Sequence, residues 1–213
     1  MMYPFELMDD PRDLSRFRFC SEQVYRDLIG TQKGEMSEKE FKSKYLTKAA
    51  ILCLDMTGFT RSAIKYGEMY SFYRILNVQK VCGPIFIEHN AQLIRAFADD
   101  FVVLFENPNN AMDAAFEVHR RIRMFNQSEL AGDEPAQTCI GIGYAELFAI
   151  GIDQAMGDEM NRASKLGEDV ARGFEVLITK RMHDAVKGRS DCQFTYQIHE
   201  EIPFHFYEAV KNT

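Results

Sequence analysis

The feature that most constrains this chain is a short apolar run that ends abruptly in a carboxylate. Residues 49–54 read Ala-Ala-Ile-Leu-Cys-Leu, and Asp55 follows directly. Because six consecutive apolar residues leave no polar face, the run predicts a strand that is buried on both faces of a sheet. We therefore expect a sheet covered on both sides, with Asp55 at the end of a central strand.

A long helical pattern follows this strand. Past Gly58, apolar residues recur at helical spacing from Tyr70 to Ile85. Pro84 is expected to kink this helix near its end, because proline cannot donate the backbone hydrogen bond. Asn90 then suits a left-handed stop.

Two short strands come next. Residues 92–98 and 101–105 are rich in apolar residues, and Asp99-Asp100 between them suits a tight turn. The pattern predicts a β-hairpin that carries carboxylates at its tip.

The same alternation of helix and strand continues to the C-terminus. We expect a helix within 111–125, a strand from 138 toward 148, a helix over about 157–171 and a strand at 174–178. Residues 194–210 suggest a final hairpin. The predicted fold class is α+β, with a ferredoxin-like βαββαβ core and extra C-terminal strands.

Length and composition set the number of domains. The chain has 213 residues, of which 46% are hydrophobic, so it can bury one sizeable core. Residues 1–47 are charged and only loosely periodic, and Lys33-Gly34 interrupts their helical pattern. We expect a partly helical N-terminal extension at 1–47 and one domain at 48–213.

Charge and cysteine usage exclude several classes of protein. A net charge of -7 argues against a nucleic-acid partner, and no apolar run reaches the roughly 18 to 20 residues of a membrane span. The odd number of cysteines and the absence of a C-x-x-C pair predict reduced, mostly buried thiols in a cytoplasmic protein. These cysteines are Cys20, Cys53, Cys82, Cys139 and Cys192.

Two carboxylates are candidates for a metal site. Asp55 ends the first strand, and Asp99 lies at the tip of a hairpin expected beside it. Two such oxygen ligands suit Mg²⁺ or Mn²⁺, and the backbone carbonyl of Met56 is a third candidate ligand. Taken singly, each aspartate is as well explained by an ordinary strand end or turn. Only their combination predicts a metal site.

The turn after Asp55 has the composition of a phosphate-binding loop. It leads from a strand into a helix, where backbone N–H groups can point at phosphate oxygens. The substrate-binding candidates here are Met56, Thr57, Gly58, Phe59 and Thr60.

The order of these motifs resembles that of the class III adenylate and guanylate cyclases. That family carries a strand ending in D-x-x-G-F-T, a hairpin K-x-x-G-D-x-F and a distal G-x-x-x-N-x-A-S-R. Here residues 55–60 read D-M-T-G-F-T, residues 95–101 read R-A-F-A-D-D-F, and residues 157–165 read G-D-E-M-N-R-A-S-K. The match spans roughly 48–180, with spacings close to those of the family.

The resemblance implies a lyase that converts a nucleoside triphosphate into a 3′,5′-cyclic monophosphate and pyrophosphate. Asp55 and Asp99 would bind two ions, Mg²⁺ or Mn²⁺. Asn161 would orient the ribose, and Lys165 would stand where the family places its transition-state arginine. In the family this helix comes from the second subunit, so a homodimer is expected.

The base of the substrate depends in the family partly on the positions of Arg95 and Gln154. Adenylate cyclases commonly carry lysine and guanylate cyclases glutamate at the first position. Arg95 can donate to a ring acceptor such as adenine N1 or guanine O6, and Gln154 can both donate and accept. Arg95 is equally well explained as a cross-strand ion-pair partner, and Gln154 as a loop residue. ATP is the predicted substrate, with GTP or a pyrimidine triphosphate as the alternative.

Some positions depart from the family pattern. Lys165 replaces an arginine that binds two phosphate oxygens at once, whereas an ammonium is a point charge. Ala98 and Ala145 stand where the family usually has glycine. Lys165 can also be explained as an ion-pair partner of acidic residues on its own helix. The non-enzymatic alternative is a degenerate cyclase fold that binds nucleotide for regulation or dimerisation, and a heterodimer in which another chain supplies the arginine also stays open.

Two further acidic residues lie next to proposed site positions. Asp100 follows Asp99, and Glu159 precedes Asn161 by two residues. Acidic residues are common in turns and in the first turn of helices. Metal binding by either residue is the alternative, and we interpret both Asp100 and Glu159 as structural.

Overall fold

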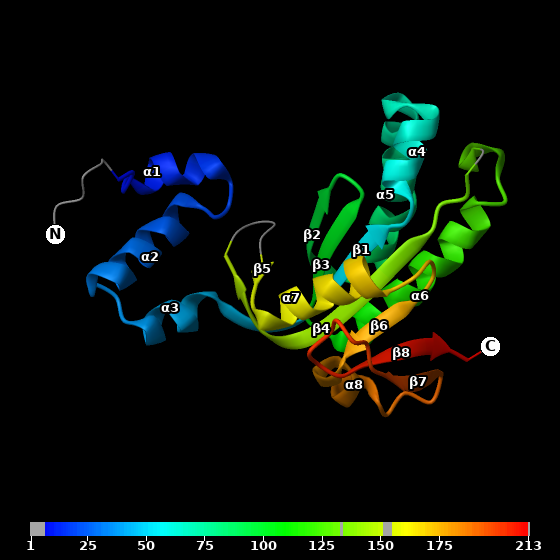
Figure 1. Cartoon of the computed structure of the whole chain (residues 1–213). Coiled ribbons are helices and arrows are strands. Elements are labelled where there is room, and N and C mark those ends of the chain that lie inside the picture. Colours follow the sequence, from blue (N-terminus) through cyan, green and yellow to red (C-terminus); the bar gives the residue numbers. More distant parts are fainter. Residues whose placement is uncertain (1–6, 133, 151–154, 213) are drawn as a thin grey trace. The chain divides into compact units, whose positions relative to one another are not determined.

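The computed structural model describes residues 7–132, 134–150 and 155–212, with residues 59–61 described by their backbone alone. Within these residues the strands form one mixed sheet in the order β2-β3-β1-β4-β6-β8-β7, and β5 pairs with the end of β4 (Figure 1). The strands are β1 (Leu46–Met56), β2 (Ala91–Phe97), β3 (Asp100–Phe105), β4 (Thr138–Ala149), β5 (Ala155–Met156), β6 (Val176–Thr179), β7 (Cys192–Gln197) and β8 (Phe206–Lys211).

Helices connect most of these strands. The helices are α1 (Pro11–Leu14), α2 (Glu22–Lys33), α3 (Glu38–Tyr45), α4 (Phe59–Tyr66), α5 (Glu68–Glu88), α6 (Pro108–Phe125), α7 (Asp158–Lys165) and α8 (Lys180–Val186). Short 3₁₀ turns are η1 (Ser15–Phe17) and η2 (Glu129–Ala131), and η3 (Leu166–Val170) is a π-helical turn that continues α7. None of the described helices is long and apolar enough to cross a membrane.

The predicted fold class is confirmed. The first four long strands and the helices between them follow the order β1-α4/α5-β2-β3-α6-β4, which is a βαββαβ unit. These four strands lie in the sheet in the order β2-β3-β1-β4, which is the strand order of a ferredoxin-like core. The strands β6, β8 and β7 extend the sheet beyond β4, and they are the extra C-terminal strands that the sequence predicted.

The chain divides into two compact units. One comprises Met1–Thr47 with Glu146–Gly157, and the other comprises Lys48–Ala145 with Asp158–Thr213. In the smaller unit, Phe148 near the end of β4 stacks against Phe41 of α3, with ring centroids 5.9 Å apart. Phe148 and Ile150 therefore share a hydrophobic core with Val24 and Phe41 of the N-terminal helices.

Strand β1 alternates between two buried faces, as its apolar run predicted. Leu52 and Leu54 belong to the main core, which also contains buried residues of α5 and α6. Because side chains alternate along a strand, Cys53 and Asp55 point to the opposite face. Asp55 is half-buried there.

Two glycines bring the α7 segment close to that opposite face. A Cβ on Gly141 of β4 would lie 2.0 Å from the carbonyl oxygen of Ala163, and a Cβ on Gly167 would lie 2.8 Å from the carbonyl oxygen of Cys53. Real Cβ atoms do not approach backbone so closely. The backbone of α7 and η3 therefore packs directly on β1 and β4 because both positions are glycine.

Several local expectations need correction. The helix predicted after Gly58 is two helices, α4 and α5, because Gly67 breaks it with a φ of +88°. The helix predicted over 157–171 gives way to a π-helical turn at Leu166. The short helix α8 was not predicted. Asn90 has a φ of +59°, so the left-handed stop is confirmed.

The cysteines follow the prediction of buried, reduced thiols. All five are buried and none forms a disulfide. Burial raises the pKa of the Cys82 thiol to about 12 and that of Cys139 to about 12, so neither is a ready nucleophile.

Candidate active site

Three carboxylates meet where β1 ends beside the β2–β3 hairpin. In the antiparallel register Cys53 pairs with Val102 and Leu54 with Phe101, which brings Asp55 opposite Asp100. Asp99 lies in the turn that precedes β3. One oxygen from each of Asp55, Asp99 and Asp100 lies within 4.8 Å of the other two. The expected proximity of Asp55 and Asp99 is confirmed.

Asp100 also belongs to this cluster, although the sequence analysis interpreted it as structural. It is the first residue of β3, where the register places it opposite Asp55. Together with burial, its carboxyl group raises the pKa of Asp55. The sequence pattern did not reveal this proximity, because only the strand register shows which hairpin residue faces Asp55.

The hairpin turn requires an unusual backbone conformation. Ala98 precedes Asp99 and has a φ of +52°, in the left-handed region. An L-residue other than glycine pays roughly 1 kcal/mol or more to adopt this conformation. Ala98 stands where the resembling family usually has glycine, so the backbone shape of the turn is kept at some cost in stability.

The carboxylate cluster is electrostatically strained. Burial raises the pKa of Asp55 to about 7, and the hydrogen bond and charge of Asp100 add to the effect, followed by the charges of Asp99 and Glu168. Burial also raises the pKa of Asp99, with a further contribution from Asp100. A bound divalent cation would offset the repulsion among these acidic oxygens and so favour their ionised form.

The donor set suits a hard divalent cation. Carboxylate oxygens are the ligands that Mg²⁺ and Mn²⁺ prefer. The cluster therefore fits such a metal both in its ligand atoms and in the repulsion among its carboxylates. The residues that could hold the metal are Asp55, Asp99 and Asp100.

The predicted phosphate-binding turn is only partly available for a ligand. Gly58 has a φ of +75° and caps the start of α4, as a strand-to-helix turn requires. The backbone N–H of Thr57, however, donates to the carbonyl of Gln137 at 3.0 Å. The Met56 side chain is buried in the main core, so only its backbone can take part. The side chains of Phe59 and Thr60 lie outside the described residues.

Arg95 lies beside a small cavity next to the carboxylates. This cavity has a volume of about 170 Å³, and Asp100, Ser164 and Glu168 also line it. The guanidinium of Arg95 lies over the ring of Phe97, 5.7 Å from its centroid. A cation on β2 therefore lines the same cavity as Asp100 of the carboxylate cluster. Gln154, the second predicted base-reading residue, falls outside the described residues.

The helix α7 turns its two predicted catalytic residues away from this cavity. Met160, Ser164 and Glu168 line the cavity at i, i+4 and i+8 spacing. Asn161 and Lys165 each lie one residue further along, which rotates them by about 100° around the helix. Neither residue lines the cavity. Asn161 and Lys165 therefore project from a different side of α7 than Met160 and Ser164 do.

Lys165 and Asn161 differ in their surroundings. The Lys165 ammonium lies 3.3 Å from a carboxylate oxygen of Asp169, four residues along the same segment. Asn161 is exposed. The ion pair with Asp169 is one of the structural explanations weighed from the sequence, and its exposed position makes it weak.

Glu159 is structural, as predicted. Its side chain is buried, accepts the backbone N–H of Tyr144 at 3.2 Å and the guanidinium of Arg181 at 2.9 Å, and also binds the hydroxyl of Thr179. These bonds fasten the start of α7 to β4 and β6.

Glu168 was missed as a neighbour of the site. It lies in the π-helical turn, where its carboxylate accepts a hydrogen bond from Ser164, and its charge contributes to the raised pKa of Asp55. The signal that could have found it is Gly167, whose missing side chain lets the turn approach β1. π-helical turns occur often at functional sites.

Solved structures with the same fold are nucleotide cyclases. The adenylyl cyclase CyaB from P. aeruginosa superposes with a TM-score of 0.68 at 19% identity, over 79% of this chain and 96% of that chain. The guanylate cyclase domain of RhGC from Catenaria anguillulae in complex with GTP gives 0.63 at 15% identity, over 78% and 97%. An adenylate/guanylate cyclase/hydrolase from Silicibacter pomeroyi gives 0.64 at 19%, over 79% and 98%.

Sequence comparison alone finds no counterpart. No protein-family model and no curated protein matches the chain. The likeness in structure covers nearly the whole length of the solved cyclase domains, and the resemblance seen in the motifs is confirmed at the level of the fold. The chain has the fold of the class III adenylyl and guanylyl cyclase catalytic domains.

Proposed function

We propose that the protein is a nucleotide cyclase that converts ATP into 3′,5′-cyclic AMP and pyrophosphate. The observation that carries the proposal is the cluster of Asp55, Asp99 and Asp100 at the end of β1, in a chain with the cyclase fold. Neither the cluster nor the fold alone supports this reaction. Together they combine a candidate metal site with a fold found in cyclases of known activity.

The metal ions bound by these carboxylates would supply charge neutralisation of the triphosphate and a lowered pKa of the attacking ribose hydroxyl. The chain's own part is to fix the carboxylates in one place. Asp55 is fixed by the end of β1, and Asp99 and Asp100 by the hairpin that pairs with it. Metal binding and ionisation of Asp55 are coupled, because its proton must leave before the oxygen can bind a cation.

Asn161 and Lys165 complete the proposed site on a second copy of the chain. Their shared spacing of four residues makes them project together from α7. Asn161 would orient the ribose through its amide, and Lys165 would stabilise negative charge that develops on the phosphates. In the proposed dimer Lys165 leaves its exposed partner Asp169, which costs little because such pairs contribute little.

An unpartnered apolar stripe supports a homodimer. One face of α5 exposes Met69, Phe72, Tyr73 and Leu76, with exposed fractions of 58%, 59%, 58% and 45%. Large apolar side chains repeated at helical spacing on the outside of a helix mark a protein interface. Because the proposed site takes Asn161 and Lys165 from a second chain, a second copy is the occupant we propose for this stripe.

The proposal of ATP as the substrate rests on Arg95. As a donor beside the cavity next to Asp100, it suits a ring acceptor such as adenine N1. The fold itself does not select the base, since both an adenylyl cyclase and a GTP-bound guanylate cyclase domain share it.

The experiment is to incubate the purified chain with Mn²⁺ and each of ATP, GTP, CTP and UTP, and to follow cyclic product and pyrophosphate. We expect the highest turnover with ATP. Asp99→Asn should reduce turnover by two orders of magnitude or more, as loss of a metal ligand does. Glu106→Gln is the matched control, because Glu106 is an exposed carboxylate just past the other end of β3, and it should retain activity.

The competing function is a nucleotide-binding module without turnover. The observation that favours it is the pairing of Lys165 with Asp169, together with the strained Ala98 before Asp99. No cyclic product from any of the four triphosphates, with nucleotide binding intact, would replace our proposal by this one.

A further inference from the structure

The short helix α4 continues the predicted phosphate-binding turn, but apolar burial does little to hold it. α4 begins directly after Gly58, and no described residue of the helix belongs to the main core. Among its described side chains only Ser62 is buried, and Ile64 is 84% exposed. Tyr66, at the far end of α4, contacts the ring of Tyr70 on α5. The buried anchor next to the turn is therefore a polar side chain.

A buried arginine of α5 binds this serine. Arg74 is 7% exposed, and its guanidinium donates to the hydroxyl of Ser62. The Ser62 hydroxyl also binds the carboxylate of Glu134, which lies 3.6 Å from the Arg74 guanidinium, and its oxygen is 3.1 Å from the carbonyl oxygen of Gly58. Lys65 of α4 lies 3.6 Å from the other oxygen of the same carboxylate. Arg74, Ser62 and Glu134 therefore form one network that reaches the turn.

The segment that supplies Glu134 also holds the other side of the turn. The backbone N–H of Thr57 donates to the carbonyl of Gln137 at 3.0 Å. Ala136, between these two residues of the segment, exchanges two hydrogen bonds of 2.8 Å with the side chain of Asn126, which caps the end of α6. Segment 134–137 is thus tied to α6 and binds the chain on both sides of Gly58.

Stability alone is a weak reason for burying the charge of Arg74. The cost of taking a guanidinium out of water is only partly offset by its ion pair, and apolar replacements of buried pairs are often neutral or stabilising. In some proteins such pairs instead fix one geometry among several. Here that geometry is the first turn of α4, for which Gly58 provides no side-chain cap. Uncapped N–H groups at a helix start bind anions such as phosphates.

We propose that Arg74 is a positioning residue for the phosphate-binding turn. Through Ser62 and Glu134 it holds the first turn of α4 against segment 134–137, so that the N–H groups of the turn meet the substrate's phosphates already ordered. This role rests on the proposed triphosphate substrate. Because β1 and the β2–β3 hairpin fix the carboxylate cluster, Arg74 acts on triphosphate binding and not on the binding of the metal alone.

The test compares the affinity of the full chain for a triphosphate with its affinity for Mn²⁺ alone, both by isothermal titration calorimetry. The triphosphate is 3′-deoxy-ATP with Mn²⁺, which lacks the attacking hydroxyl and so is not cyclised. Arg74→Met removes the charge and the donor. It should weaken 3′-deoxy-ATP about tenfold or more, as the loss of a charge-assisted hydrogen bond to a phosphate does. The affinity for Mn²⁺ alone should stay unchanged.

Two further variants keep the test decisive if Arg74→Met folds poorly. Ser62→Ala removes the link between Arg74 and the turn and keeps a good helix former, so it should weaken 3′-deoxy-ATP to a similar extent. Arg74→Lys keeps a cation and a donor, so it should retain most of the native affinity. A role in stability alone would lower the urea midpoint of these variants and leave the affinity of the folded molecules unchanged.

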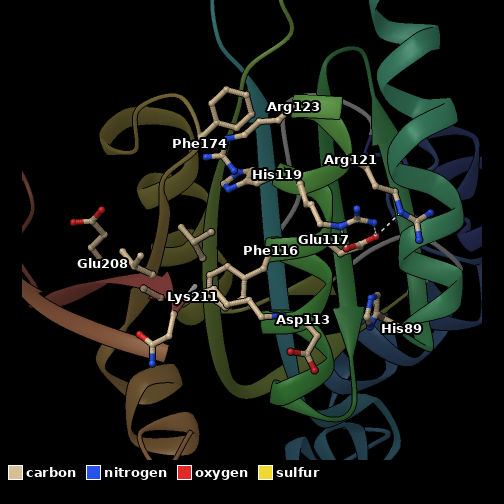
Figure 2. Close-up of a pocket in the computed structure, with 15 residues that line it drawn as sticks. His89, Asp113, Phe116, Glu117, His119, Arg121, Arg123, Phe174, Glu208 and Lys211 are labelled. Carbon is tan, nitrogen blue, oxygen red and sulfur yellow. Dashed lines mark hydrogen bonds and ion pairs between the residues drawn. The ribbon is translucent and has the colours of Figure 1, made fainter. Parts of the chain in front are cut away.

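Arg189→Met is the matched control. Arg189 is also largely buried, with 13% of its side chain exposed, and it pairs with Asp113 at 2.6 Å and with Asp191 at 2.7 Å. Figure 2 shows Asp113 and Arg123 toward opposite ends of α6, and segment 134–137 follows the Arg123 end. Arg189→Met should therefore lower the urea midpoint but leave the affinity for 3′-deoxy-ATP at the native value.

Two results would overturn the proposal, and they are distinguishable. In the first, the native chain binds 3′-deoxy-ATP, and Arg74→Met and Ser62→Ala bind it equally well. The network then does not position the turn, and the proposed cyclase activity is unaffected. In the second, the native chain does not bind 3′-deoxy-ATP with Mn²⁺ at all. The proposed substrate is then wrong, and the role proposed for Arg74 is lost with it.

Discussion

At the residue scale, Asp55 is the side chain whose chemistry is most perturbed. Its ordinary pKa is 3.8, and burial and the acidic neighbours Asp100, Asp99 and Glu168 raise it to about 7. Between about pH 4 and pH 7, the folded chain therefore keeps a proton on Asp55 that the unfolded chain has already released. This proton links stability, pH and metal binding at a single position.

The first prediction follows from the sign of this shift. Without metal, Asp55 contributes most to stability below about pH 4, and this contribution is lost as the pH rises through about 7. Added Mn²⁺ should therefore raise the urea midpoint more at pH 8 than at pH 5, because the cation replaces the proton. Urea unfolding at both pH values, with EDTA or with Mn²⁺, measures this difference.

Asp55→Asn should flatten the pH dependence and abolish most of the Mn²⁺ effect. Glu106→Gln should behave like the native chain. An equal Mn²⁺ effect at pH 5 and pH 8 would contradict the proposed role of Asp55.

Lys165 is the residue at which the chain departs most from the motif it resembles. A guanidinium can bind two phosphate oxygens at once, whereas an ammonium cannot. We predict that Lys165→Arg raises kcat severalfold, with little change in KM, because the gain applies to the transition state. Initial rates over a range of ATP concentrations separate the two constants. A lower kcat would show that this position does not reach the phosphates.

Some site residues could be recognised from the sequence and others could not. Asp55 ends an unmistakable buried run, and Asp99 lies in an obvious turn, so both stood out. The proximity of Asp100 to Asp55 had no such signal, because it depends on the strand pairing that places Asp100 opposite Asp55.

At the scale of elements, the hairpin turn before Asp99 carries a measurable strain. Ala98 adopts a left-handed φ of +52°, which glycine would adopt without a Cβ penalty. We predict that Ala98→Gly stabilises the chain by about 1 kcal/mol. Ala185→Gly, at an exposed position inside α8, should instead destabilise it by about 1 kcal/mol. Denaturant unfolding of both variants gives the two signs, and destabilisation by Ala98→Gly would contradict the account.

The close packing of α7 and η3 on the sheet gives a second prediction at this scale. A Cβ on Gly141 would lie 2.0 Å from the carbonyl oxygen of Ala163, so the helix would have to move. Gly141→Ala should destabilise the chain by about 2 kcal/mol or more, as overpacking does. Gly188→Ala is the matched control, because nothing lies within 4 Å of its Cβ position. Equal stability of the two variants would mean that α7 packs less closely than described.

Elements with a clear pattern of apolar residues were predictable, whereas elements whose ends depend on tertiary contacts were not. The apolar run of β1 and the helical pattern of α6 identified both elements. The break between α4 and α5 rests on the single residue Gly67, whose positive φ the apolar pattern does not reveal. The π-helical turn η3 depends on Gly167 meeting β1, which no local pattern encodes.

At the scale of the whole molecule, we propose a site built from two chains. Asp100 of the carboxylate cluster lines the small cavity, whereas Asn161 and Lys165 do not. An exposed apolar stripe on α5 offers an interface for a second copy. A head-to-tail dimer would then carry two sites, each built from residues of both chains.

The N-terminal extension also belongs at this scale. Residues 1–47 form one compact unit with 146–157. Phe41 and Phe148 are in ring contact within this unit. Sequence reasoning separated the extension from the domain at residue 47 but gave no sign that a sheet segment far along the chain shares its core.

The most direct test of the central claim is complementation between two inactive variants. Asp99→Asn removes a proposed metal ligand, and Asn161→Ala removes a proposed ribose ligand. In an equal mixture half of the dimers are mixed, and each mixed dimer has one intact site out of two. Turnover of ATP with Mn²⁺ should therefore return to about a quarter of the native rate. A mixture as inactive as either variant alone, with dimers exchanging subunits, would contradict a cyclase site built from two chains.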